Sequence, residues 1–311
     1  MFGKDTLKTK IIYLRSHLWH ICKLLRNTLW RITMGISVDE LFTLRELDAQ
    51  TIFEGGIRMK LIYRDPGYKY SANSISEFIK QDEFWSEPIF HFFPELLKFK
   101  GLHNKSTDNK DIVKEISGTV VELYKSREKE IQSKVISYQE NWDCHEKLIN
   151  ERFSSIFKFD TNKVFNSLIC NITLNPISPR YLRECVFDVF YLNSDEGSLG
   201  SALHEIAHYL WFYLWNQKYE GSYEQYESPS LVWVLSEAVV EQILRDEEFD
   251  RINPYHKNGN AYPYFYNMII NGRPLYDYLD KIYINNSIEK FMDMSYQFMA
   301  ENEEEIRSQM L

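Results

Sequence analysis

Apolar residues recur every three or four positions through much of the first half of the chain, which is the spacing of one face of an α-helix. The helices that this spacing predicts cover residues 8–33, 38–53, 74–99 and 111–158, the last as one long helix or two. Pro88 and Pro94 predict breaks within residues 74–99, because proline lacks the N–H group that a helix interior needs. The first half of the chain is therefore predicted to be a block of helices.

The pattern changes after residue 165. Residues 167–174 and 185–192 are runs of β-branched, aromatic and other apolar side chains, and each run has the length of a strand. Helical spacing then returns. The helices that it predicts cover residues 195–217 and 231–246, followed by two or three helices within 264–309. The predicted fold class is mainly α with a small β-sheet, an α+β arrangement.

The charge divides the chain further. Residues 1–38 contain seven Lys or Arg and one Asp, a charge of +6, whereas the whole chain of 311 residues has a charge of −9. We therefore predict a basic amphipathic helix over residues 1–37, a helical N-terminal region over 38–165, and a region over 166–311 that contains the sheet. The basic helix has two interpretations. It packs on the body of the protein, which we favour, or its residues 8–33 lie on an anionic membrane surface.

The composition excludes several classes of protein. Only 12 Gly and 9 Pro are present, which excludes collagen-like and Gly/Pro-rich disordered chains, and 15% aromatic residues require a core. An overall negative charge is not typical of a nucleic-acid binder. No secretory signal is evident, and the longest apolar run, near residues 206–215, is too short to span a bilayer. Four scattered cysteines without a CxxC pair indicate reduced thiols, so we expect a cytoplasmic protein.

The sequence His204-Glu205-Ile206-Ala207-His208 is an HExxH motif within the predicted helix over residues 195–217. Two histidines four positions apart project from one helix face and can share a zinc ion. Glu205 can take a proton from a zinc-bound water and pass it to a leaving amine. The alternative is a pair of core histidines whose ring nitrogens are satisfied by neighbouring polar groups.

The next predicted helix contains two glutamates in an otherwise apolar sequence. Glu237 and Glu241 lie one turn apart on the same face. A catalytic zinc needs a third protein ligand, which Glu237 can supply, and Glu241 can accept a hydrogen bond from the far nitrogen of a ligand histidine. The alternative is a solvated stripe in which Arg245 pairs with Glu241. Glu220, Glu224 and Glu227 are rival third ligands, ranked lower because a ligand on a packed helix is held more rigidly.

The sequence HEIAH followed on a later helix by LSEAVVE resembles the gluzincin group of zinc metallopeptidases, which includes thermolysin-like and aminopeptidase-like enzymes. The resemblance covers residues 185–246. It implies zinc binding by His204, His208 and Glu237, a general base at Glu205 and a supporting carboxylate at Glu241.

The same resemblance implies two further features. A strand ahead of the HExxH helix, here residues 186–192, would bind the substrate backbone along its edge. A Tyr or His would stabilise the oxyanion of the tetrahedral intermediate, and we select His256 or Tyr262 from the tyrosine-rich segment after the second helix.

These expectations describe a zinc metallopeptidase, a hydrolase whose cofactor is Zn²⁺ and whose partner is a peptide or protein substrate rather than nucleic acid. The alternative is a non-catalytic, zinc-stapled binding or regulatory protein built on the same scaffold. A site closed by a fourth protein ligand would favour this alternative, and an open site would favour the enzyme.

Overall fold

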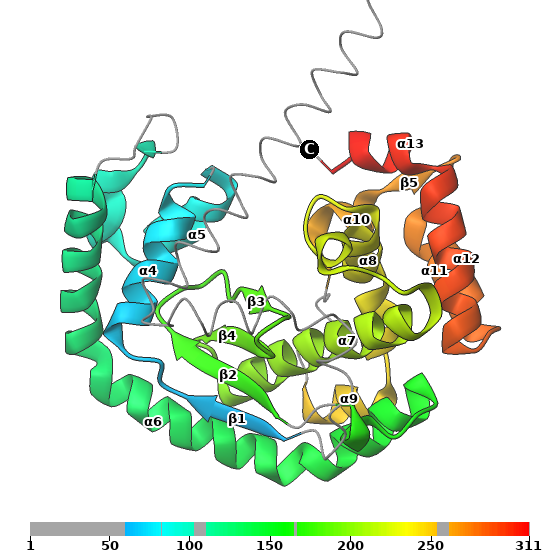
Figure 1. The fold of residues 1–311 in the computed structure, drawn as a ribbon, viewed down its shortest axis with the longest axis horizontal. Helices are drawn as coiled ribbons and strands as arrows, with labels where there is room; N and C mark the ends of the chain where they lie inside the picture. Colours follow the sequence, from blue (N-terminus) through cyan, green and yellow to red (C-terminus); the bar gives the residue numbers. More distant parts are fainter. Residues whose placement is uncertain (1–59, 82, 103–109, 165–166, 254–260, 311) are drawn as a thin grey trace, which may run out of the picture. The chain divides into compact units, whose positions relative to one another are not determined.

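The computed structural model describes most of the chain after residue 59 (Figure 1). The described residues are 60–81, 83–102, 110–164, 167–253 and 261–310. The predicted helices over residues 8–33 and 38–53 lie outside them. All described residues belong to one compact unit, Ala49–Leu311.

The described residues between 68 and 157 are mainly helical, as predicted. Their helices are α4 (Tyr68–Ile79), α5 (Glu83–Phe92), the short 3₁₀ helix η1 (Pro94–Phe99) and α6 (Lys110–Phe157). Residues 110–157 form a single 48-residue helix, which decides between one helix and two. The predicted break at Pro88 is wrong, because α5 continues through this residue. A proline ring has a φ close to the helical value, so α5 loses one hydrogen bond there without ending.

A four-stranded mixed sheet joins the two halves of the chain. Its strands are β1 (Leu61–Arg64), β2 (Leu168–Thr173), β3 (Arg180–Tyr181) and β4 (Val186–Phe190), in the spatial order β1-β2-β4-β3. The first three in this order are parallel, and β3 is antiparallel to β4 at the edge. The two predicted strands are confirmed as β2 and β4. Residues 186–192 were expected to form an edge strand along which a substrate binds. This expectation is wrong, because β4 lies between β2 and β3, and β3 forms the edge.

Helix α6 lies along the other edge of the sheet, beside β1 (Figure 1). The Gln139 side chain accepts a hydrogen bond from the Tyr63 N–H group (2.9 Å) and donates one to the Leu61 carbonyl (3.2 Å). An unpaired strand edge leaves backbone polar groups without partners. Gln139 therefore replaces part of the missing neighbouring strand.

The central helix α7 (Asp195–Tyr219) begins at Ser194, whose hydroxyl accepts a hydrogen bond from the Gly197 N–H group. Tyr209 is buried on this helix and donates hydrogen bonds to the backbone carbonyls of Tyr181 (3.1 Å) and Val186 (3.0 Å). One side chain of α7 thus holds both β3 and β4. This contact fixes the edge strand relative to the helix that carries the HExxH motif.

Helix α8 (Leu231–Leu244) begins at Ser230 and contacts α7, α11 and α12. The elements around it are η4 (Tyr223–Tyr226), α9 (Glu247–Ile252), α10 (Pro263–Asn267), the hairpin of β5 (Ile269–Ile270) and β6 (Arg273–Pro274), α11 (Leu275–Ile284), α12 (Ile288–Glu301) and α13 (Glu303–Ser308). The mainly helical class with a small sheet is therefore confirmed.

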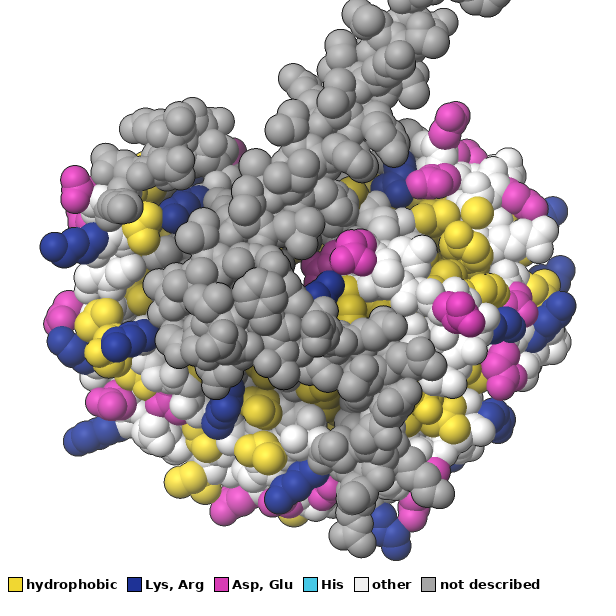
Figure 2. All heavy atoms as spheres, viewed as in Figure 1, with side chains coloured by type: hydrophobic (Ala, Val, Ile, Leu, Met, Phe, Trp, Pro, Cys, Tyr) yellow, Lys and Arg dark blue, Asp and Glu magenta, His cyan; other side chains and the backbone are white. Residues whose placement is uncertain are grey.

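The surface of the described residues is mixed in charge on the face shown in Figure 2, where acidic and basic side chains are interspersed with apolar ones. Among these residues, none of the helices combines the length and the apolar character needed to cross a bilayer.

Candidate metal centre

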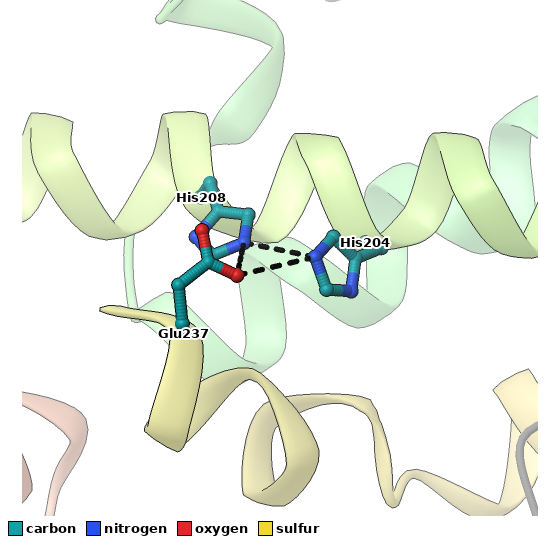
Figure 3. Close-up of side chains that lie close together, drawn as sticks. All are labelled: His204, His208 and Glu237. Atoms are coloured by element: carbon teal, nitrogen blue, oxygen red, sulfur yellow. Dashed lines mark hydrogen bonds and ion pairs between the residues drawn. The ribbon is translucent and has the colours of Figure 1, made fainter. Parts of the chain in front are cut away.

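Helix α7 presents His204 and His208 one turn apart, and their rings face the same space (Figure 3). The two Nε2 atoms are 3.0 Å apart. His208 is buried, whereas His204 is partly exposed. The helix is held on the sheet by Tyr209, the residue after His208, so the spacing of the two rings is fixed by packed secondary structure.

Glu237 extends from α8 toward the two histidines (Figure 3). Its Oε2 atom lies 3.3 Å from Nε2 of His208 and 3.7 Å from Nε2 of His204. The carboxylate is 6% exposed, so it has little contact with solvent. Three side chains separated by up to 33 positions in the sequence thus form a group whose ligand atoms all lie within 4.8 Å and that can hold a metal ion.

The geometry of this group fits zinc. Two ligand atoms that each lie about 2.1 Å from a tetrahedral ion are about 3.4 Å apart. The three distances between the ligand atoms here are 3.0, 3.3 and 3.7 Å, which bracket that value. Two imidazoles and one carboxylate are also a donor set typical of catalytic zinc. The spacing of these three atoms is therefore compatible with a tetrahedral ion.

The charges of the group suit a cation as well. Burial opposes ionisation of Glu237, but His208, His204 and Arg180 outweigh it and hold the pKa of this carboxyl well below its usual range. Burial, with Arg180 as the next cause, lowers the pKa of His208 to about 4, so this ring is neutral at pH 7. An ionised carboxylate and a neutral imidazole are the forms that bind a metal ion.

His204 differs from His208 in its environment. Burial alone would lower its pKa, but the carboxylates of Glu237 and Glu205 outweigh burial and raise the pKa of this imidazole. Its ring is the more exposed of the two. Both histidines therefore lie beside Glu237, but burial outweighs its charge at His208, and Glu237 and Glu205 together outweigh burial at His204.

Arg180 is the residue of this centre that sequence analysis missed. Its Nη1 atom lies 2.7 Å from Oε2 of Glu205, and its Nη2 atom lies 3.4 Å from Oε1 of Glu237. The guanidinium is 10% exposed. Arg180 reaches the site only because β3 folds back antiparallel to β4, and no motif or spacing in the sequence relates it to HExxH.

Glu205 lies on α7 directly after His204, and its side chain is 13% exposed. One carboxylate oxygen accepts the hydrogen bond from Arg180. Arg180 thus links Glu205, the predicted general base, to Glu237 of the metal group.

Glu241 is buried one turn beyond Glu237. Its carboxylate accepts hydrogen bonds from Arg245 Nε (3.3 Å) and from Tyr266 Oη (2.5 Å). The predicted alternative was a solvated stripe with this Arg245 pair; the pair is present, but the Glu241 side chain is 7% exposed, so the stripe is not solvated. The predicted hydrogen bond from a ligand histidine to Glu241 stays a prediction.

Tyr262 is the predicted oxyanion residue that the structure describes, and His256 lies outside the described residues. The ring of Tyr262 stacks on Tyr264, with centroids 5.4 Å apart. Burial raises the pKa of Tyr262, and the carboxylate of Glu237 adds to this shift. Its role at an oxyanion stays a prediction.

Comparisons with protein-family models, with curated proteins and with solved structures found no match.

Proposed function

We propose that this protein is a zinc-dependent peptidase. The observation that carries the proposal is the convergence of both HExxH histidines with Glu237, while Glu205 lies beside them. A bound zinc ion would polarise the scissile carbonyl and lower the pKa of a water molecule. Glu205 would accept a proton from that water and transfer it to the nitrogen of the leaving amine.

An open coordination position supports catalysis over the non-catalytic alternative. Among the described residues, the group has three members, His204, His208 and Glu237. Three protein ligands leave the fourth position of a tetrahedral ion for water or substrate, whereas structural zinc sites are closed by four.

The edge strand β3 offers a place for a peptide substrate. It is the outer strand of the sheet, and its Arg180 side chain reaches the metal group. An extended peptide can pair with such an edge through its backbone. The proposed partner is therefore a peptide or protein that lies along β3 with one peptide bond near the metal.

The test uses the full chain loaded with zinc and a mixture of peptides of defined sequence, analysed by mass spectrometry. The wild-type chain is expected to bind about one zinc ion and to cleave peptides in a reaction that chelation stops. Glu205→Gln should retain zinc and lose at least about 100-fold of the rate, the usual contribution of a general base. Glu196→Gln, an exposed glutamate of the same helix, is the matched control and should retain both properties.

Two results would contradict the proposal. Undiminished cleavage by Glu205→Gln would remove this residue from the mechanism. A wild-type chain that binds zinc but cleaves none of the peptides would favour a zinc-stapled binding protein.

A further inference from the structure

Arg180 is a buried cation that touches two carboxylates of the candidate metal centre. Its guanidinium contacts Glu205 at 2.7 Å and Glu237 at 3.4 Å. Arginine is ionised at every pH at which proteins are folded, so this positive charge is permanent. A charge buried at this position needs an explanation, because desolvating it has a cost that its surroundings must offset.

The position of Arg180 is fixed by the fold. The backbone of β3 is held to α7 through the Tyr209 hydroxyl, which donates to the Tyr181 carbonyl. The guanidinium lies 5.9 Å from the ring of Phe212, and Phe212 stacks on the ring of His208. Phe212 therefore lies next to both the guanidinium and the ring of a candidate metal ligand.

The charges around the candidate centre predict its net charge when a divalent ion is bound. Glu205 and Glu237 contribute two negative charges, and Arg180 contributes one positive charge. A divalent ion bound by Glu237 and the two neutral imidazoles would leave one positive charge in excess. A buried site with an excess positive charge attracts an anion, and this attraction is strong where water is excluded.

Arg180 also has hydrogen-bond donors left for such an anion. A guanidinium has five N–H donors, and the contacts to the described residues use one from Nη1 and one from Nη2. The remaining donors project from a planar group that already contacts both the proposed base and a metal ligand.

We propose that Arg180 binds the anionic oxygen of the tetrahedral intermediate, and this inference rests on the proposed peptidase function. In the step concerned, the oxygen of water forms a bond to the carbonyl carbon, and the π electron pair moves onto the carbonyl oxygen. The proton of the water passes to Glu205. Arg180 donates a hydrogen bond to the oxygen that has gained the electron pair. Collapse of the intermediate then breaks the C–N bond, and the proton on Glu205 moves to the leaving nitrogen.

The test measures anion binding independently of cleavage. The full chain is loaded with Co²⁺, whose visible spectrum reports ligands that enter the metal centre, and is titrated with inorganic phosphate and separately with imidazole. Phosphate is a tetrahedral anion, whereas imidazole binds a metal ion in its neutral form, which predominates when the titrations are run at about pH 8. Arg180→Met should weaken phosphate binding about 10- to 100-fold, the loss expected for one charge-assisted hydrogen bond, and should leave imidazole binding nearly unchanged.

Two further variants complete the design. Arg180→Lys keeps the charge but lacks the planar fork, so its phosphate affinity should lie between those of the wild type and Arg180→Met. Arg183→Met is the matched control, because Arg183 is a more exposed arginine three positions away that pairs with Glu224. It should bind phosphate as the wild type does. Metal stoichiometry and circular dichroism establish that each variant is folded and loaded, and Arg180→Lys carries the test if Arg180→Met fails to fold.

Several outcomes overturn the inference. If Arg180→Met weakens phosphate and imidazole binding equally, Arg180 only neutralises the two carboxylates. If phosphate affinity is unchanged in Arg180→Met, or in Arg180→Lys where that variant carries the test, Arg180 binds no anion. A chain that binds neither Co²⁺ nor Zn²⁺ overturns both the inference and the proposed function. Phosphate binding that depends on Arg180 in a chain that cleaves no peptide contradicts the peptidase proposal but leaves Arg180 as an anion-binding residue.

Discussion

At the scale of single residues, Glu237 is the one carboxylate of the candidate metal group among the described residues. It is buried, ionised and within 3.7 Å of both histidine nitrogens. Mutation of a residue that hydrogen-bonds to a metal ligand typically lowers the metal affinity about 10- to 100-fold. Glu237→Ala removes a proposed ligand itself, so it should weaken zinc binding by more than about 100-fold. Competition with a chromophoric chelator measures the affinity. Glu247→Ala, at an exposed glutamate of α9, is the control, and full zinc affinity in Glu237→Ala would point to another ligand.

A second buried carboxyl lies on β4. Asp188 is fully buried, and its Oδ1 atom accepts hydrogen bonds from Tyr70 Oη (2.8 Å) and Asn171 Nδ2 (3.1 Å). Burial raises the pKa of this carboxyl to about 7. When the pKa is higher in the folded state than in the unfolded state, the folded protein binds more protons than the unfolded protein at any pH between the two pKa values. The contribution of Asp188 to stability therefore decreases as the pH rises from about 4 to 7.

This decrease can be measured with Asp188→Asn, which has the same shape but no charge. Relative to the wild type, the variant should gain about 2–3 kcal/mol in its free energy of unfolding between pH 5 and pH 8. Urea unfolding at the two pH values gives the difference. Asp277→Asn, at an exposed aspartate of α11, should show no such trend. A constant difference between wild type and Asp188→Asn would mean that Asp188 is ionised throughout this range.

At the scale of helices, two glycines in helix interiors have opposite surroundings. A Cβ atom at Gly118 in α6 would have no heavy atom within 4 Å, whereas one at Gly200 in α7 would overlap Nδ2 of Asn253 and lie 3.1 Å from its Cγ. Asn253 is buried, so its side chain has little room to move. Gly118→Ala should stabilise the protein by about 0.5–1 kcal/mol, and Gly200→Ala should destabilise it by about 1–3 kcal/mol. Chemical denaturation measures both, and a stabilised Gly200→Ala would show that Asn253 gives way.

The helices and strands also show which features a sequence can predict. Helices α6, α7 and α8 were predicted within a few residues of their ends, because each has many turns of consistent apolar spacing. Strands β1 and β3 were missed, since four and two residues contain too little periodicity to recognise. The three members of the candidate metal group could be predicted from local motifs on two helices. Arg180 could not, because its place in the site is created by the pairing of β3 with β4.

At the scale of the whole compact unit, helix α6 connects the sheet to the segment after α8. It lies against β1 through Gln139, and near its end Arg152 forms a two-pronged ion pair with Asp246. Asp246 also caps α9 by accepting a hydrogen bond from the Glu248 N–H group (3.0 Å). One long helix thus constrains both the strand layer and the end of the helix that supplies Glu237. The direct connection between α7 and α8 at the candidate centre would be completed by a metal ion.

If zinc occupies the candidate centre as proposed, the stability of the whole unit should depend on zinc. A ligand that binds only the folded state stabilises it by about 2.7 kcal/mol when its free concentration is 100 times Kd. For a unit of this size, that corresponds to an increase in Tm of roughly 5–10 °C. Differential scanning calorimetry with zinc and with excess chelator should show this difference in the wild type. His208→Ala should lose it, and His145→Ala, which changes a histidine of α6 outside the centre, should retain it. An equal Tm in both conditions for the wild type would contradict a metal ion that bridges α7 and α8.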